Sequence, residues 1–270
     1  SVVTLDSKSV VGQTIKVKAS LSNADLWTPD SPTLYTARLS LVNGDHVLDT
    51  VKSRFGMRQF IIDGYRILLN GRPIILRGFG DDHIYPKQMA MPSDKDLHLR
   101  QLRTIKSYGF NHVRHHSTVM PPEYYDACDE IGMISTAEFP ICYNICLPGV
   151  GSKWKENVPE GTSPAAALDT YRREWTAVLL QYRNHPSILA WVMGNELGQY
   201  DALDKPRALF ADIARKYDPQ RFFLDSDGVA NSVLQDPKND RDMLDFYTIQ
   251  FDDPGANPID TPGKFSSPRP

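Results

Sequence analysis

The sequence has few cysteines, no long apolar run and no excess of positive charge. No apolar stretch approaches the roughly 20 residues that cross a bilayer, so we expect no membrane contact. The net charge is −3 and the lysines and arginines are dispersed, which argues against nucleic acid as a partner. Three cysteines, Cys128, Cys142 and Cys146, form neither a disulfide framework nor a zinc motif. We expect Cys128 to pack as a small apolar residue on a helix.

A glycine-rich phosphate-binding turn is also missing. No G-x-G-x-x-G pattern follows the first strand of the repeating part of the chain, which disfavours a doubly wound dinucleotide-binding sheet. We therefore expect no cofactor and no bound metal.

The first part of the chain shows short, alternating apolar patterns. They occupy residues 15–19, 35–41 and 47–51, and Asn43-Gly44-Asp45 is a hairpin turn signal between two of them. Antiparallel strands at this spacing indicate a partial immunoglobulin-like β-sandwich, which we assign to residues 1–62.

From residue 63 to 270 apolar strands alternate with amphipathic helices, which predicts an α/β fold. Helix signals include Ser93 with Asp96, a start at Pro122 with a stop at Gly132, and helices over 164–183 and from Pro206 to Tyr217. The favoured architecture is a (β/α)8 TIM barrel truncated after strand six, because about 250 residues form a complete barrel. The expected strands are 74–76, 111–114, 133–137, 188–193, 221–224 and 246–251.

Polar side chains follow each expected strand, and in a βα-barrel these ends build the ligand site. The most informative is the apolar run 188–193, which ends in Gly194-Asn195-Glu196. An alternative is that Asn195 and Glu196 cap a helix. Capping leaves the flanking Gly194 and Gly198 unexplained, so we favour a chemical role. The other candidates at strand ends include Asp82, His83, Arg114, His116, Glu138 and Asp227, and further polar side chains there are Asp225, Gln250, Asp252 and Asp253.

Motifs along most of the chain resemble glycoside hydrolase family 2, which contains β-galactosidases, β-glucuronidases and β-mannosidases. They are Leu26-Trp-Thr-Pro-Asp-Ser-Pro-Thr-Leu-Tyr35, Arg54-Phe-Gly-Met-Arg58, Leu69-Asn-Gly-Arg-Pro-Ile-Ile-Leu-Arg-Gly78, Gly109-Phe-Asn-His-Val-Arg114, Tyr125-Asp-Ala-Cys-Asp-Glu-Ile-Gly132 and Arg183-Asn-His-Pro-Ser-Ile188 leading to Glu196.

The resemblance implies a mechanism and roles for single residues. Glu196 matches the family's general acid/base, Asn195 the residue that holds the sugar 2-hydroxyl, and Arg114 the arginine that supports the catalytic carboxylates. A retaining glycosidase also needs a nucleophilic carboxylate about 5–5.5 Å from the acid. The family's nucleophile lies at the end of strand seven, so we expect it beyond Pro270 and expect this chain alone to have little activity.

The segments at the substrate subsite depart from those of better-known members. Gly80-Asp-Asp-His83, His115-His-Ser117 and Glu138-Phe-Pro140 replace the familiar patterns. We expect Asp82, His83, His116, Glu138 and Asp227 to bind substrate, but the terminal β-linked sugar is not identified by them. The resemblance suggests an oligosaccharide or polysaccharide partner and an extracellular or periplasmic location; the oligomeric state stays open.

Two other functions use the same residues differently. A non-catalytic carbohydrate-binding fragment would hold sugar in the same crevice without cleaving it. A metal-dependent hydrolase would use His83, His115, His116 and Asp227 as ligands. The second is disfavoured because neighbouring His115 and His116 point to opposite faces of a strand.

Overall fold

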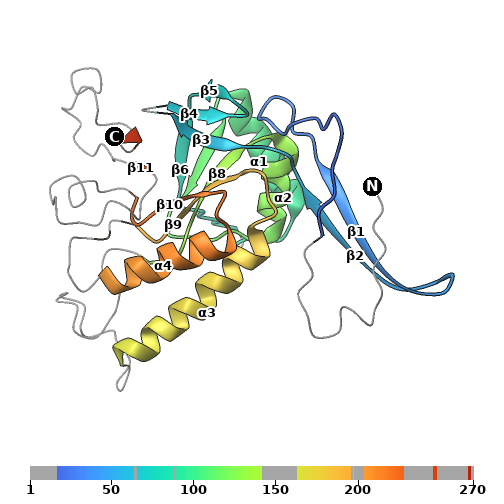
Figure 1. Ribbon diagram of the computed structural model, residues 1–270. Helices are drawn as coiled ribbons and strands as arrows, with labels where there is room; N and C mark the ends of the chain where they lie inside the picture. The colour runs from blue at the N-terminus through green and yellow to red at the C-terminus, as the bar shows by residue number, and fades with distance from the viewer. Residues whose placement is uncertain are drawn as a thin grey trace.

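The centre of the structure is a parallel five-stranded sheet. The computed structural model describes residues 17–63, 66–87, 89–141, 163–195, 197, 204–227, 246–247 and 267–268. The sheet order is β10-β9-β8-β7-β6, so strands adjacent in the sequence are adjacent in space (Figure 1). The strands are β6 (Gly78–Asp81), β7 (His112–His115), β8 (Ile134–Glu138), β9 (Ile188–Val192) and β10 (Phe222–Leu224).

One helix follows each of the first four of these strands, as in a TIM barrel. The helices are α1 (Lys95–Ser107), α2 (Pro122–Ile131), α3 (Pro164–Tyr182) and α4 (Asp204–Tyr217). They lie outside the sheet (Figure 1). The predicted barrel architecture is therefore confirmed, with five parallel strands in the part of the chain that the structure describes.

The helix ends follow their local sequence. Asp94 caps α1, because its side chain accepts hydrogen bonds from the amides of Asp96 and Leu97. The predicted cap, Ser93, was therefore one residue too early. α2 ends at Gly132 as predicted, with a φ of 74° that glycine adopts without strain.

The first parallel strand is β6, and not residues 74–76 as the sequence suggested. Residues 72–74 instead form β5 (Arg72–Ile74), the last strand of an antiparallel sheet with β4 (Arg66–Leu69) and β3 (Phe60–Asp63). Asn70 and Gly71 both have positive φ, which makes the tight turn between β4 and β5. The turn therefore places residues 72–74 in the antiparallel sheet, although the apolar run that follows the turn resembles a buried strand.

Part of the predicted sixth strand is seen as β11 (Phe246–Tyr247). It pairs antiparallel with β12 (Ser267–Pro268). The other residues of that prediction lie outside the described ranges, as do Cys142 and Cys146.

The N-terminal region contains one long antiparallel hairpin. Its strands are β1 (Tyr35–Asn43) and β2 (His46–Phe55), joined at the predicted turn, where Gly44 has a φ of 59°. Residues 17–19 form no strand, contrary to the expectation for 15–19, of which residues 15 and 16 lie outside the described ranges. The hairpin extends away from the barrel (Figure 1).

Trp27 fixes this region to the barrel. The indole is fully buried, and its Nε1 donates to the Asp129 carbonyl of α2 at 2.9 Å. Arg54 on β2 pairs with Asp126 and Glu130 on the same helix. The motifs around Trp27 and Arg54 are thus structural contacts between the two parts of the chain.

The barrel core lies between the sheet and its helices. Its large buried side chains include Trp175, Trp191, Tyr125 and Phe210. Cys128 is buried among them, as predicted. Within the described residues, none of the helices combines the length and the apolar character that a membrane span requires.

Candidate active site at the carboxyl ends of the strands

Arg114 gathers the polar side chains that end three other strands. Its Nη2 donates to Glu138 Oε2 at 3.0 Å and to Asn195 Oδ1 at 2.5 Å. Its Nε lies 2.7 Å from Asp227 Oδ2 in an ion pair. These residues come from β7, β8 and the segments that follow β9 and β10. The Arg114 guanidinium therefore holds three other predicted site residues together.

Glu138 is fully buried and strongly bound. Its Oε1 accepts from the Ser117 amide at 2.7 Å and from the Ser117 hydroxyl at 3.2 Å. Burial raises the pKa of Glu138 to about 7, and the nearby charge of Asp227 also raises it, whereas Arg114 and the Ser117 amide lower it. The raised pKa therefore leaves a large fraction of Glu138 protonated near neutral pH.

The backbone on both sides of Glu196 is held firmly. The Asn195 amide donates to the Ile141 carbonyl at 2.8 Å, and the Asp227 amide donates to the Gly194 carbonyl at 3.0 Å. The Leu197 amide donates to Ser226 Oγ at 3.0 Å. Asn195 and Leu197 are both buried. Glu196 itself lies outside the described residues, so its predicted role stays a prediction.

Gly194 has a packing role. A Cβ at this position would lie 2.4 Å from the Ile141 carbonyl oxygen, well inside any allowed contact. Close backbone packing therefore accounts for Gly194 without a chemical role, whereas Gly198 lies outside the described residues. The Asn195 side-chain oxygen accepts from Arg114 Nη2 and the described Leu197 is not helical, so the described residues give no support to the capping alternative.

The histidines divide between the core and the surface. His83 Nε2 and His115 Nδ1 form a hydrogen bond of 2.7 Å, and both rings pack edge-on against Tyr124. Burial lowers the pKa of both imidazoles, which favours their neutral forms. His116 is partly exposed, with its Nδ1 3.4 Å from Asp82 Oδ1. His115 and His116 thus diverge as predicted.

The predicted site is therefore split. Arg114, Glu138, Asn195 and Asp227 meet, whereas Asp82 and His116 make a separate pair nearer solvent. The His83 side chain has no exposed surface. Its ring packs on His115 and Tyr124 and is not part of the Arg114 network, so its contact with substrate stays a prediction.

The described residues His83, His115, His116 and Asp227 do not form a group with metal-compatible spacing. Among described residues, the one group with metal-compatible spacing is Asp126, Asp129 and His185. Its atoms already have protein partners: His185 Nδ1 lies 2.7 Å from Asp129 Oδ2, and Asp126 pairs with Arg54. These contacts connect α2 to the loop before β9 and to β2.

Two residues that bind carboxylates at or near the site were not predicted from the sequence. Ser117 supplies two donors to Glu138 from 21 positions away, and a φ of 50° directs its amide inward. Arg207 on α4 forms a buried ion pair with Asp225 at 2.9 Å, just before Asp227. Only the folded chain brings these partners together, so no local pattern could identify them.

The chain belongs to glycosyl hydrolase family 2. Residues 60–251 match the family's TIM barrel domain, and residues 2–58 match a second domain described as glycosyl hydrolases family 2.

The relatives carry glycosidase names. A putative beta-glucuronidase of Formosa agariphila is 30% identical over 79% of this chain and 26% of its own length. A beta-galactosidase of Photobacterium profundum is 27% identical over 84% of this chain and 20% of its own length. The present chain thus spans about a quarter or less of these relatives.

Solved structures agree on the fold. The b-glucuronidase of Ruminococcus gnavus in complex with C6-substituted uronic isofagomine has a TM-score of 0.70 and 25% identity, covering 85% of this chain and 37% of that one. The Parabacteroides merdae Beta-Glucuronidase has a TM-score of 0.62 and 24% identity, covering 85% of this chain and 26% of that one.

Proposed function

We propose that this chain carries the acid/base half of a retaining glycosidase site that cleaves a β-linked terminal sugar. The observation that supports the proposal most is the Arg114 network, which joins Glu138, Asn195 and Asp227 at the carboxyl ends of the strands. Family membership and the names of the relatives support hydrolysis of a glycosidic bond.

In this proposal Glu196 donates a proton to the glycosidic oxygen and then activates water. Asn195 binds the 2-hydroxyl of the sugar, and Arg114 fixes the Asn195 amide through the bond of 2.5 Å. A proton donor must be held rigidly toward the leaving oxygen, and the anchored amides of Asn195 and Leu197 provide that support. Asp82 and His116 are proposed to contact substrate at the rim.

The second carboxylate required for retention is expected beyond Pro270. It would attack the anomeric carbon and form a glycosyl ester, which water cleaves in the second step. The carbohydrate-binding alternative predicts sugar binding without this chemistry.

The test uses a longer protein that contains this chain. We would incubate it with 4-nitrophenyl β-glucuronide, β-galactoside and β-mannoside and follow the released sugar by proton NMR during the first minutes. We expect one of these sugars to appear first as its β-anomer. First appearance of the α-anomer would refute retention, and sugar binding without release from any substrate would favour the non-catalytic alternative.

A further inference from the structure

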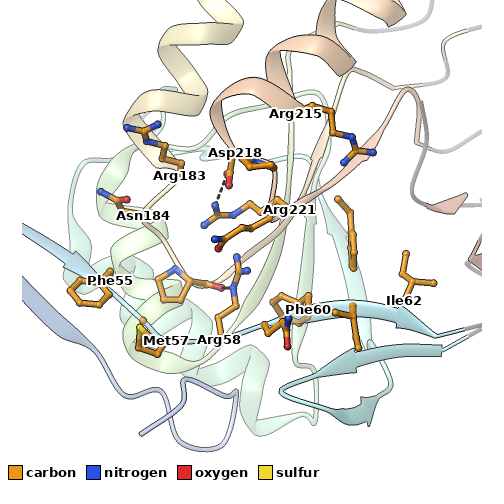
Figure 2. A pocket seen from close by; sticks show the side chains of 17 residues that line it. Phe55, Met57, Arg58, Phe60, Ile62, Arg183, Asn184, Arg215, Asp218 and Arg221 are labelled. Carbon is orange, nitrogen blue, oxygen red and sulfur yellow. Dashed lines mark hydrogen bonds and ion pairs between the residues drawn. The ribbon is translucent and has the colours of Figure 1, made fainter. Parts of the chain in front are cut away.

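A cavity of about 990 Å³ lies at the amino-terminal ends of β9 and β10, opposite the Arg114 network (Figure 2). Its walls come from residues 55–62, from the segment after α3 and from the end of α4 with the loop that follows. The charged side chains that line it are Arg58, Arg183, Arg215, Arg221 and Asp218. Among the described residues, four arginines and one carboxylate therefore line the cavity.

The Asp218 carboxylate already accepts two hydrogen bonds from the protein. Asp218 Oδ2 accepts from Arg221 Nη1 at 2.5 Å and from Trp191 Nε1 at 2.9 Å. Arg58 has neutral partners: its Nε donates to the Pro186 carbonyl at 3.0 Å and its Nη2 to the Ile188 carbonyl at 2.8 Å. These bonds fix the guanidinium to neutral acceptors, while the charges of Asp218 and Asp129 act on it from nearby.

Arg58 and Arg221 are held close together. Arg221 Nε donates to the same Ile188 carbonyl at 2.9 Å, so two guanidinium groups share one acceptor. Figure 2 shows their side chains directed toward one another, with Arg183 and Arg215 on either side. Two cations at this separation repel, and the Asp218 carboxylate relieves part of that repulsion. A bound anion would relieve more of it.

Burial and the charge of Arg221 lower the pKa of Arg58 to about 9, so the side chain remains cationic at neutral pH. A guanidinium is well suited to phosphate and sulfate, since its planar donors match two oxygens of a tetrahedral oxyanion.

The cavity also offers apolar surface beside these cations. The Arg58 guanidinium lies 4.9 Å from the centre of the Phe60 ring, and Phe55, Met57 and Phe222 line the same space. A free inorganic ion would leave most of the volume unfilled. Cavities of this size commonly hold small organic molecules.

We propose that this cavity binds a small organic molecule that carries a phosphate or sulfate ester. Arg58 binds the oxyanion, Arg183 and Arg215 add attraction from the rim, and the organic part packs against the aromatic wall. The proposal does not depend on the glycosidase function, because the site lies at the other end of the strands.

Isothermal titration calorimetry on this chain tests the proposal, with glucose 6-phosphate and glucose 6-sulfate as probes. Unesterified glucose and inorganic sulfate serve as comparisons, all at one ionic strength set with sodium chloride. We expect both esters to bind at least about tenfold more tightly than either comparison ligand, because only they use both the cations and the apolar wall. Equal binding of glucose would refute the role of the oxyanion, and equal binding of inorganic sulfate would refute the organic ligand.

Variants locate the binding. Arg215→Gln removes an exposed charge at the rim and should weaken ester binding about threefold, whereas Arg103→Gln on the exposed face of α1 should leave it unchanged. Arg58→Gln should weaken it at least about tenfold. Because Arg58 also donates hydrogen bonds to two backbone carbonyls, the circular dichroism spectrum of the Arg58→Gln variant is compared with that of the wild type to show that the variant folds. A folded Arg58→Gln with unchanged affinity, or an equal loss in Arg103→Gln and Arg215→Gln, would overturn the proposal.

Discussion

The protonation of Glu138 should make the stability of this chain depend on pH in a direction unusual for a carboxylate. Its pKa is raised from 4.5 to about 7 in the folded protein, chiefly by burial. Between these values the folded state keeps a proton that the unfolded chain releases. Stability from this group is therefore present at low pH and is lost as the pH rises toward 7. A shift of one pKa unit corresponds to about 1.4 kcal/mol, so we expect a loss of roughly 2–3 kcal/mol between pH 5 and pH 8.

Glu138→Gln removes this titration while keeping the size of the side chain. Buried histidines such as His112 make the protein less stable at acidic pH. The quantity to follow is therefore the free energy of unfolding of the variant minus that of the wild type. We would measure urea unfolding by tryptophan fluorescence at pH 5, 6, 7 and 8. As the pH rises from 5 to 8, the free energy of unfolding of the variant should increase by roughly 2–3 kcal/mol relative to that of the wild type. Glu174→Gln, at an exposed position of α3, is the matched control. A difference constant to within about 0.5 kcal/mol across this range would refute the argument.

Three further predictions concern packing and charge. Gly194→Ala places a methyl group against the Ile141 carbonyl and should cost about 1–3 kcal/mol in urea unfolding, whereas a change within error would show that the strand shifts freely. Asp218→Ala leaves buried Arg221 without its carboxylate and should cost about 3 kcal/mol or more, against little for Asp212→Ala on the exposed face of α4; equal effects would contradict the ion pair's importance. Burial lowers the pKa of His112 to about 4, so its contribution to stability is present above pH 6.5 and is lost as the pH falls toward 4. His112→Gln should reduce that acid loss by roughly 3 kcal/mol, and an unchanged acid slope would contradict it.

The sequence predicted the barrel well because its signals are local. Apolar strands alternate with helices whose ends carry recognisable caps, such as the left-handed Gly132 that ends α2. The first strand was misplaced because residues 74–76 are apolar enough for a buried strand. The structure instead begins the sheet at Gly78, since the Asn70-Gly71 turn folds residues 72–74 back on β4.

The site was predictable to the extent that parallel strands place their ends together. Arg114, Glu138, Asn195 and Asp227 are among the strand-end residues that this rule marks, and they do meet. The rule does not say which way a side chain turns after the strand ends. His83 follows β6 as expected, yet its backbone adopts a φ of 54° and its ring packs on His115 in the core. Likewise, the contact between Ser117 and Glu138 depends on the tertiary arrangement of two loops.

The most direct test of the account replaces the proposed proton donor. In the longer protein, Glu196→Gln is compared with the wild type on a series of aryl β-glycosides whose leaving groups differ in acidity. A good leaving group departs without protonation, so we expect the rate of bond cleavage to fall by at least about a hundredfold on poor leaving groups and little on dinitrophenyl glycosides. An equal effect, or none, across the whole series would contradict the role of Glu196 as the acid.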